Sequence, residues 1–167
     1  MDRTIELETA RMLHDEHVRI LALLRRLEGY SRREDAGAPP DAASDGGLLG
    51  DVVAAIEGEM TLHFDFEEAV IFPLLAEEGE EPLGALLREE HAAIRAVAAA
   101  LVQAAKTARR GGFSPASWNG FQHLARDFIG ALGAHAEKEE FGLIPLLDTM
   151  IAPEDDAAMA EHYAGMH

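Results

Sequence analysis

The chain has no cysteine, and its 14 lysines and arginines are outnumbered by 31 aspartates and glutamates. The absence of cysteine excludes disulfides, thiolate nucleophiles and cysteine-bound zinc or iron–sulfur clusters. A net charge of −17 repels nucleic-acid phosphates and anionic membrane surfaces, so neither is expected as a partner. Apolar runs are too short to span a membrane, and the N-terminus does not resemble a signal peptide. We therefore expect a cytoplasmic protein.

Aromatic residues make up only 6% of the chain and β-branched residues are few, whereas alanine and leucine are abundant. This composition favours helices over strands. A length of 167 residues is enough for one domain with a hydrophobic core and is short for two. The sequence therefore predicts an all-α fold in a single domain spanning residues 1–167, with its core at about 9–150.

Apolar residues recur at steps of three and four along four long segments, which predicts four helices. Their approximate limits are 9–28, 48–76, 83–109 and 115–150. The connection at about 30–47 is rich in glycine, proline and aspartate and is predicted to be a flexible loop, whereas the other two connections are short. This pattern is typical of an antiparallel up-down four-helix bundle. The C-terminal tail, about 151–167, is predicted to contain a short helix.

Particular residues refine these helices. Gly29 is predicted to end the first helix. Pro73 and Pro145 are predicted to kink the second and fourth helices, because proline removes a backbone donor. On the second helix, we expect the inward face to continue from Glu67 to Val70 and Leu74, following the helical period.

One pair of motifs occurs twice, in the same order. The first copy consists of Glu16-His17 and, later, His63-x-x-x-Glu67-Glu68. The second consists of Glu90-His91 and, later, His135-x-x-x-Glu139-Glu140. The first histidines of the two copies are 74 residues apart and the second histidines are 72 apart. A repeat of this kind indicates two halves of a helical bundle that each supply half of a metal site.

The spacing of four places a histidine and a glutamate on the same helix face, one turn apart. A carboxylate inside a bundle is costly unless it is paired or bound to a metal. The sequence therefore predicts six metal ligands, which are His17, His63, Glu67, His91, His135 and Glu139. Glu67 and Glu139 can bridge two cations, and this donor set suits iron or manganese better than a structural zinc. Coordination positions remain for a small diatomic molecule or peroxide.

The order His17, His63-x-x-x-Glu67, His91, His135-x-x-x-Glu139 resembles the hemerythrin-like, or HHE cation-binding, domain family. The sequences Phe72-Pro73-Leu74-Leu75 and Ile144-Pro145-Leu146-Leu147 strengthen the resemblance, which covers about 9–150. It implies an up-down four-helix bundle that holds two iron ions (Fe²⁺/Fe³⁺) with a bridging oxo or hydroxo group, with manganese or zinc as substitutes. It also implies binding of oxygen, sensing of oxygen or iron, or a role in nitrosative or oxidative stress.

Two positions differ from the oxygen-carrying hemerythrins. Arg95 stands where those proteins have a further histidine, and Glu139 follows His135 by four residues where they place an aspartate at five. Loss of that histidine implies a more open or more flexible site than simple oxygen carriage requires. The chain also resembles the metal domain of iron-centre repair proteins, but it lacks their cysteine-bearing segment.

Other polar residues have weaker claims on the site. Glu68 and Glu140 are expected at the helix flanks, either behind the ligands or at the surface, although Glu140 is an alternative to Glu139 as a ligand. His14 is expected at the surface or behind the ligands. His123 is expected in packing or at the surface, and the tail histidines, His162 and His167, in solvent. Trp118 is expected to anchor the neighbouring loop.

Three functions remain open from the sequence. The first is a di-iron protein that binds or reacts with O2, NO or peroxide. The second is a module that holds iron for storage, sensing or regulation of an unknown protein partner, without turnover, which is favoured by the lack of an obvious general acid or base beside the ligands. The third is a helical bundle without metal, which would leave buried carboxylates unpaired. Whether the protein is an enzyme is not decided by the sequence.

Overall fold

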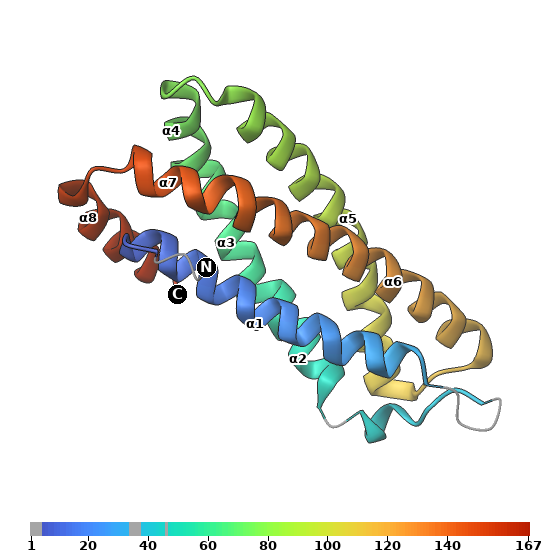
Figure 1. The fold of residues 1–167 in the computed structure, drawn as a ribbon. Helices are drawn as coiled ribbons and strands as arrows, with labels where there is room; N and C mark the ends of the chain where they lie inside the picture. Colours follow the sequence, from blue (N-terminus) through green and yellow to red (C-terminus); the bar gives the residue numbers. More distant parts are fainter. Residues whose placement is uncertain (1–4, 34–37, 46) are drawn as a thin grey trace.

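The computed structural model describes residues 5–33, 38–45 and 47–167, and its regular structure within these ranges is helical, with no β-strand. The predicted all-α fold is therefore confirmed. Four long helical segments lie side by side, and a short fifth helix packs against the beginning of the first (Figure 1). Within the described ranges, none of these helices combines the length and the apolar character needed to cross a bilayer.

The first long segment is α1, Glu8–Ser31. The prediction that Gly29 ends this helix is wrong, because Tyr30 is buried in the core and the Ser31 hydroxyl donates to the carbonyl of Glu28, which closes one further turn. The predicted loop at about 30–47 includes 34–37 and 46, which lie outside the described residues. Its described part contains a 3₁₀ turn, η1 (Ala42–Ser44), whose backbone is capped by Asp41.

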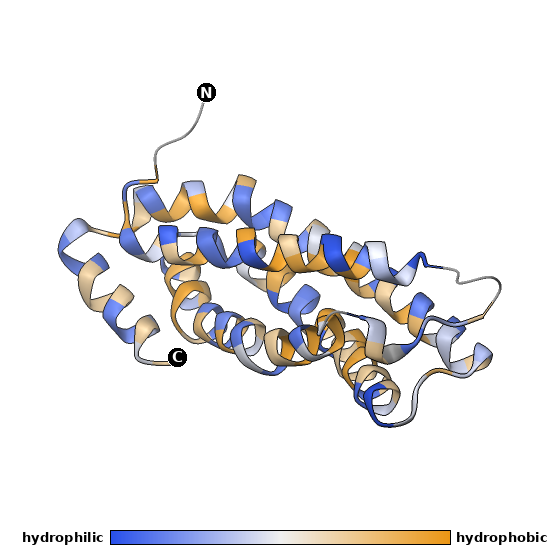
Figure 2. Cartoon of the chain, turned by 90° about the horizontal axis from the view of Figure 1, so that it is seen from below, coloured by the Kyte–Doolittle hydropathy of each residue, from blue (hydrophilic) through white to orange (hydrophobic). Residues whose placement is uncertain are grey.

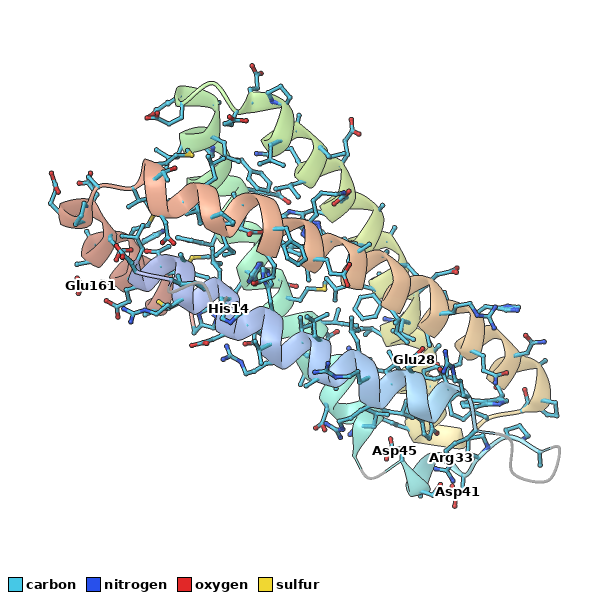
Figure 3. The ribbon with its side chains drawn as sticks, viewed as in Figure 1. His14, Glu28, Arg33, Asp41, Asp45 and Glu161 are labelled. Carbon is cyan, nitrogen blue, oxygen red and sulfur yellow. The ribbon has the colours of Figure 1, made fainter. Side chains whose placement is uncertain are left out.

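The end of this connection is held by side chains. Asp45 accepts hydrogen bonds from the backbone nitrogens of Gly47 and Leu49, at the start of the second long segment. Arg33, Asp41 and Asp45 cluster at one end of the molecule, opposite the end where Glu161 lies (Figure 3). The connection therefore joins the first two segments far from the C-terminal helix.

The second long segment is continuous but not uniformly α-helical. It consists of α2 (Leu48–Ala55), η2 (Ile56–Met60), α3 (Thr61–Phe66), η3 (Glu67–Ile71) and α4 (Phe72–Glu77). The fourth consists of α6 (Pro115–Lys138), η4 (Glu139–Leu143) and α7 (Ile144–Met150). The turns η2, η3 and η4 are π-helical, with one more residue per turn than usual. The third segment is α5 (Glu81–Gly111), and the short fifth helix is α8 (Pro153–Ala164).

Two of the π-helical turns lie immediately before Pro73 and Pro145. A proline ring collides with the carbonyl four residues earlier in a regular α-helix. For Pro73 and Pro145 these are the carbonyls of Ala69 and Phe141, which lie in the wider turns η3 and η4. The second and fourth segments remain helical through both prolines. The π-helical turns also begin at Glu67 and Glu139, two of the six predicted ligands.

The extra residue in η3 changes which side chains face inward. Ile71 and Leu75 are completely buried, whereas Val70 and Leu74 are only partly buried. The expectation that Val70 and Leu74 continue the inward face is therefore wrong by one position. A π-helical turn advances the inward face by one residue, because it holds about one residue more than an α-turn.

The apolar interior is divided into two clusters. One cluster surrounds Leu101, Phe121 and Trp118, towards the end of the molecule that carries η1. The ring centroids of Trp118 and of Phe113, in the α5–α6 connection, are 4.9 Å apart, as expected if Trp118 anchors this loop. The other lies among α4, α7 and α8 and includes Tyr163. In Figure 2 the hydrophobic residues line the inner faces of the helices and the hydrophilic residues cover much of the outside.

Between the two clusters lies a layer of buried polar residues. On α1, His17 is preceded by Leu13 of one cluster and followed by Leu24 of the other. On α5, His91 lies in the same way between Leu87 and Ile94. The long segments thus bring their polar residues to one level of the interior, enclosed on both sides by apolar packing.

Candidate metal centre

The six predicted ligands meet in this buried layer. None has more than 5% of its surface exposed, and Glu67, His91 and Glu139 have none. Their nitrogen and oxygen atoms form two groups in which every atom lies within 4.8 Å of the others. One group contains Glu67, His91, His135 and Glu139, and the other contains His17, His63 and Glu139. We call these six residues the inner donors.

Glu139 extends one carboxylate oxygen towards each group. Its Oε2 lies 3.0 Å from Nε2 of His17 and 3.7 Å from Nε2 of His63, and its Oε1 lies 2.9 Å from Nε2 of His135. Glu67 is placed similarly, with Oε1 3.3 Å from Nε2 of His63 and Oε2 3.3 Å from Nε2 of His91. Each glutamate therefore has the placement that a carboxylate bridging two cations requires.

Each inner histidine turns its other ring nitrogen, Nδ1, towards a glutamate. We call these four glutamates the outer carboxylates. Glu16 contacts His63 at 2.6 Å, Glu68 contacts His91 at 2.9 Å, Glu90 contacts His135 at 2.9 Å, and Glu140 contacts His17 at 2.6 Å. Each long segment thus holds the histidine of the next one along the chain, and the fourth holds the histidine of the first.

This ring explains the dipeptides of the sequence repeat. The expectation that Glu68 and Glu140 lie behind the ligands agrees with their contacts, and it is Glu139 that reaches both groups. The roles of Glu16 and Glu90 were missed. Their signal was their repetition, one residue before His17 and His91, but a neighbouring residue on a helix points about 100° away, so its contact with another segment cannot be read from spacing alone.

The outer carboxylates have partners of their own. Glu68 forms ion pairs with Arg88 and Arg95, Glu90 pairs with Lys138, and Glu140 contacts His14 at 2.8 Å. Arg95, at the position where oxygen carriers have a histidine, therefore holds an outer carboxylate. His14 contacts the same carboxylate that holds His17, in agreement with its expected place behind the ligands.

The remaining histidines lie away from the inner donors. His123 and His162 are exposed, as expected. The expectation that His167 is merely solvated is wrong, because its Nε2 lies 3.2 Å from Oε1 of Glu16 and its Nδ1 contacts the carbonyl of Tyr163. Packing of α8 against α1 brings the end of the chain to this outer carboxylate.

Electrostatic interactions among these groups are strong because water is excluded. Burial alone lowers the pKa of His91, but the carboxylates of Glu139 and Glu67 raise it to about 9. The pKa of His63 is likewise raised well above its usual range by Glu67 and Glu139, against the opposing effect of burial. Burial alone raises the pKa of Glu139, but its contacts with His135 and His17 hold it well below the usual range. The carboxylate of Glu139 is therefore held in its charged form.

Two features test whether these residues fit a metal. Both carboxylate oxygens of Glu67 are buried without a hydrogen-bond partner, as is Oε1 of Glu139. Unpartnered buried charge is costly, and a cation removes that cost. In addition, Nε2 of His91 and Nε2 of His135 lie 3.1 Å apart. The outer carboxylates hold Nδ1 of both rings, so Nε2 is the atom that would bind a cation, in place of the proton that the raised pKa of His91 implies without metal.

The distance between these nitrogens also suits coordination. When two imidazole nitrogens bind the same ion, each at about 2.1 Å, and the angle between the two bonds is a right angle, the nitrogens lie about 3.0 Å apart. Mixed imidazole and carboxylate donors, without any thiolate, suit iron, manganese or zinc. The residues present therefore fit a pair of transition-metal ions.

Comparison with protein families agrees with this reading. The family model described as the hemerythrin HHE cation binding domain matches residues 9–147. No curated protein sequence matches the chain at a significant level. The matched region contains all six inner donors and all four outer carboxylates, and it ends before α8 begins at Pro153. The chain therefore belongs to the hemerythrin HHE cation-binding domain family.

Proposed function

We propose that this protein binds two iron ions between Glu67 and Glu139 and that it binds or reacts with a small oxidant such as O2, NO or peroxide, in sensing or in a stress response. The observation that carries the proposal is the sharing of Glu139 by two groups of buried donors. One ion would be held by His17 and His63 and the other by His91 and His135, with both glutamates bridging. Manganese or zinc would bind as substitutes.

The proposal includes the arrangement of the whole chain. We infer an antiparallel up-down four-helix bundle in a single domain, because successive long segments are in contact and the fourth also packs against the first. In such a bundle each segment supplies donors at the same level of the core. The ring of outer carboxylates follows the same order around the bundle.

A cavity beside the His17 and His63 group supports a small ligand. Its volume is about 30 Å³, and its lining includes the apolar side chains of Ile20, Met60 and Leu132 as well as His17, His63 and His135. A cavity needs about 10–15 Å³ to admit one water molecule, so this one has room for a diatomic molecule or peroxide. With both glutamates bridging, each ion would have about four protein donors, which leaves positions free for a small ligand.

The protein residues would tune the centre in two ways. The outer carboxylates fix the ring orientation of each histidine and make Nε2 a better donor. The apolar walls keep water away from the bound ligand. Bound iron would supply the capacity to coordinate the small molecule and to exchange electrons with it.

The proposal is tested by loading the protein with ferrous iron and then adding azide or nitric oxide as a probe. We expect about two irons per chain and a new absorption band when the probe binds. His63→Ala should lose at least one iron, whereas His123→Ala, which changes an exposed histidine, should bind iron as the wild type does. Binding of fewer than about two irons by the wild type, or unchanged binding by His63→Ala, would contradict the proposal.

A second function is a module that holds iron for storage, sensing or regulation of a protein partner, without turnover. It is favoured by the enclosure of the site, since the inner donors are buried and the adjoining cavity is small. Steady-state consumption of peroxide and reduction of nitric oxide distinguish the two functions. Turnover favours the first, whereas a change of conformation with oxidation state in the absence of turnover favours the second.

A further inference from the structure

The C-terminal helix α8 lies outside the region that matches the family, yet it places a side chain behind the metal centre. Tyr163 of α8 is completely buried. Its ring stacks on Phe66 with a centroid distance of 4.2 Å, and its hydroxyl donates a hydrogen bond to Oε2 of Glu16. Burial, together with the neighbouring Glu16, raises the pKa of Tyr163 far above its usual range, so the phenol keeps its proton and remains a donor.

Glu16 is the outer carboxylate of the His17 and His63 group. The same oxygen that accepts from Tyr163 lies 2.6 Å from Nδ1 of His63. Burial alone raises the pKa of Glu16, but its contacts with His63 and Tyr163 lower it, so that the carboxylate is charged and accepts from both. A continuous chain of hydrogen bonds therefore runs from α8 through Glu16 to an inner histidine.

This link occurs at one half of the centre. Among the described contacts, the partners of Glu68 come from α5, those of Glu90 from α6 and those of Glu140 from α1, and none comes from α8. Of the four outer carboxylates, Glu16 is the one that contacts Tyr163 and His167 in the described part of the chain. The half of the centre that adjoins the cavity is thus also the half that depends on the C-terminal helix.

We propose that Tyr163 is a positioning residue for the metal ion held by His17 and His63, and that it acts through Glu16 to fix the orientation of the His63 ring. The inference rests on the proposed function and assigns to α8 control over one of the two ions. Loss of the hydroxyl leaves Glu16 with one strong donor fewer and lets the His63 ring reorient. Mutation of a residue that holds a metal ligand in this way typically lowers metal affinity or activity about 10- to 100-fold.

A separate contact holds α8 in place. The carboxylate of Asp156 accepts hydrogen bonds from the backbone nitrogens of Glu8 at 2.7 Å and Thr9 at 3.0 Å. It thereby caps α1, whose own N-cap residue, Leu7, has no capping side chain. Asp156→Asn therefore weakens the docking of α8 while keeping both Tyr163 and Glu16, which makes it a control for loosening of the helix.

The test compares iron release from Tyr163→Phe and from the wild type, each loaded with ferrous iron and then mixed with an excess of an iron chelator. The substitution keeps the buried ring on Phe66 and removes only the hydroxyl. We expect one iron to leave about 10- to 100-fold faster and the other to leave at the wild-type rate. The Mössbauer spectrum of the loaded variant should change for one iron environment and not for the other.

Tyr30→Phe is the matched control. It removes the only other tyrosine hydroxyl, also in a buried side chain, from a position about 21 Å from Glu16 along α1. Tyr30→Phe and Asp156→Asn should both release iron at the wild-type rates. Wild-type release by Tyr163→Phe would overturn the inference, and so would equal acceleration of both irons. Acceleration by Asp156→Asn as large as that by Tyr163→Phe would also overturn it, because packing of the tail would then be the cause. Failure of the wild type to take up iron would refute the proposed function itself, and the inference with it.

Discussion

Replacement of Glu67 by glutamine should remove most of the stability that metal gives to the fold. Glu67 is completely buried, and neither of its oxygens has a hydrogen-bond partner. An ion that is present at 1,000 times its dissociation constant stabilises the folded state by about 4.1 kcal/mol. For a chain of 167 residues, each kcal/mol corresponds to about 2–4 °C in Tm, so each of the two proposed ions should raise the wild-type Tm by about 8–16 °C.

Glu67→Gln keeps the shape of the side chain but cannot bridge two cations as a carboxylate does. Mutation of a residue behind the ligands lowers metal affinity by up to about 100-fold. Loss of a ligand itself should lower the affinity by at least that much. The same metal concentration is then about 10 times the dissociation constant and contributes about 1.4 kcal/mol. Each ion should therefore raise the Tm of the variant by no more than about 3–6 °C.

The metal-free proteins give a second comparison. Without metal, Glu67→Gln should be no more stable than the wild type at neutral pH, because the amide cannot form ion pairs with His63 and His91, whose pKa the Glu67 carboxylate raises. Thermal unfolding of chelator-treated and metal-loaded samples measures both effects. Glu57→Gln, which changes an exposed glutamate of the same long segment, is the control and should respond to metal as the wild type does. A metal response of Glu67→Gln equal to that of the wild type would refute the reasoning.

Three further predictions address other parts of the structure. Glu90→Gln should weaken metal binding about 10- to 100-fold in a chelator competition, because Glu90 holds the Nδ1 of His135; an unchanged affinity would count against the outer ring. Leu132→Phe should fill the cavity and weaken azide or nitric oxide binding while iron content stays at the wild-type level; equal probe affinity would place the ligand elsewhere. Asp156→Asn should lower the free energy of unfolding at neutral pH by about 1 kcal/mol, the usual value of a helix cap. Burial raises the pKa of Asp156, but its bonds to Thr9 lower it on balance, so its contribution is fully present above the ordinary value of about 3.9 and is lost as the pH falls through the lowered pKa of the folded state. In urea unfolding, the difference between the variant and the wild type should therefore be largest at neutral pH and should shrink as the pH is lowered below about 3.9.

The inner donors could be predicted from the sequence because their residue types suit metal binding and their spacing fits one helix face. A histidine and a glutamate four residues apart share a helix face, and their repetition brought His17 and His91 into the same site. The helices themselves followed from apolar spacing, and their limits were right within a few residues. The last turn of α1 was missed because Gly29 is an ambiguous signal, which the packing of Tyr30 outweighs.

Other features depend on three-dimensional context. The π-helical turn that begins at Glu67 moves the buried face from Val70 to Ile71. This shift could not be predicted from the regular spacing of an α-helix. The contacts of Glu16 and Tyr163 join residues 147 positions apart, so local patterns could not reveal them. A long-range hydrogen bond of this kind is specified by the packing of α8 on α1, which follows from the whole fold.

The most direct measurement of the central claim is anomalous X-ray diffraction at the iron edge from crystals of the iron-loaded protein. Two anomalous peaks are expected between Glu67 and Glu139, one within bonding distance of His17 and His63 and the other within bonding distance of His91 and His135. The absence of peaks among these six side chains, or peaks confined to the acidic surface, would contradict the account.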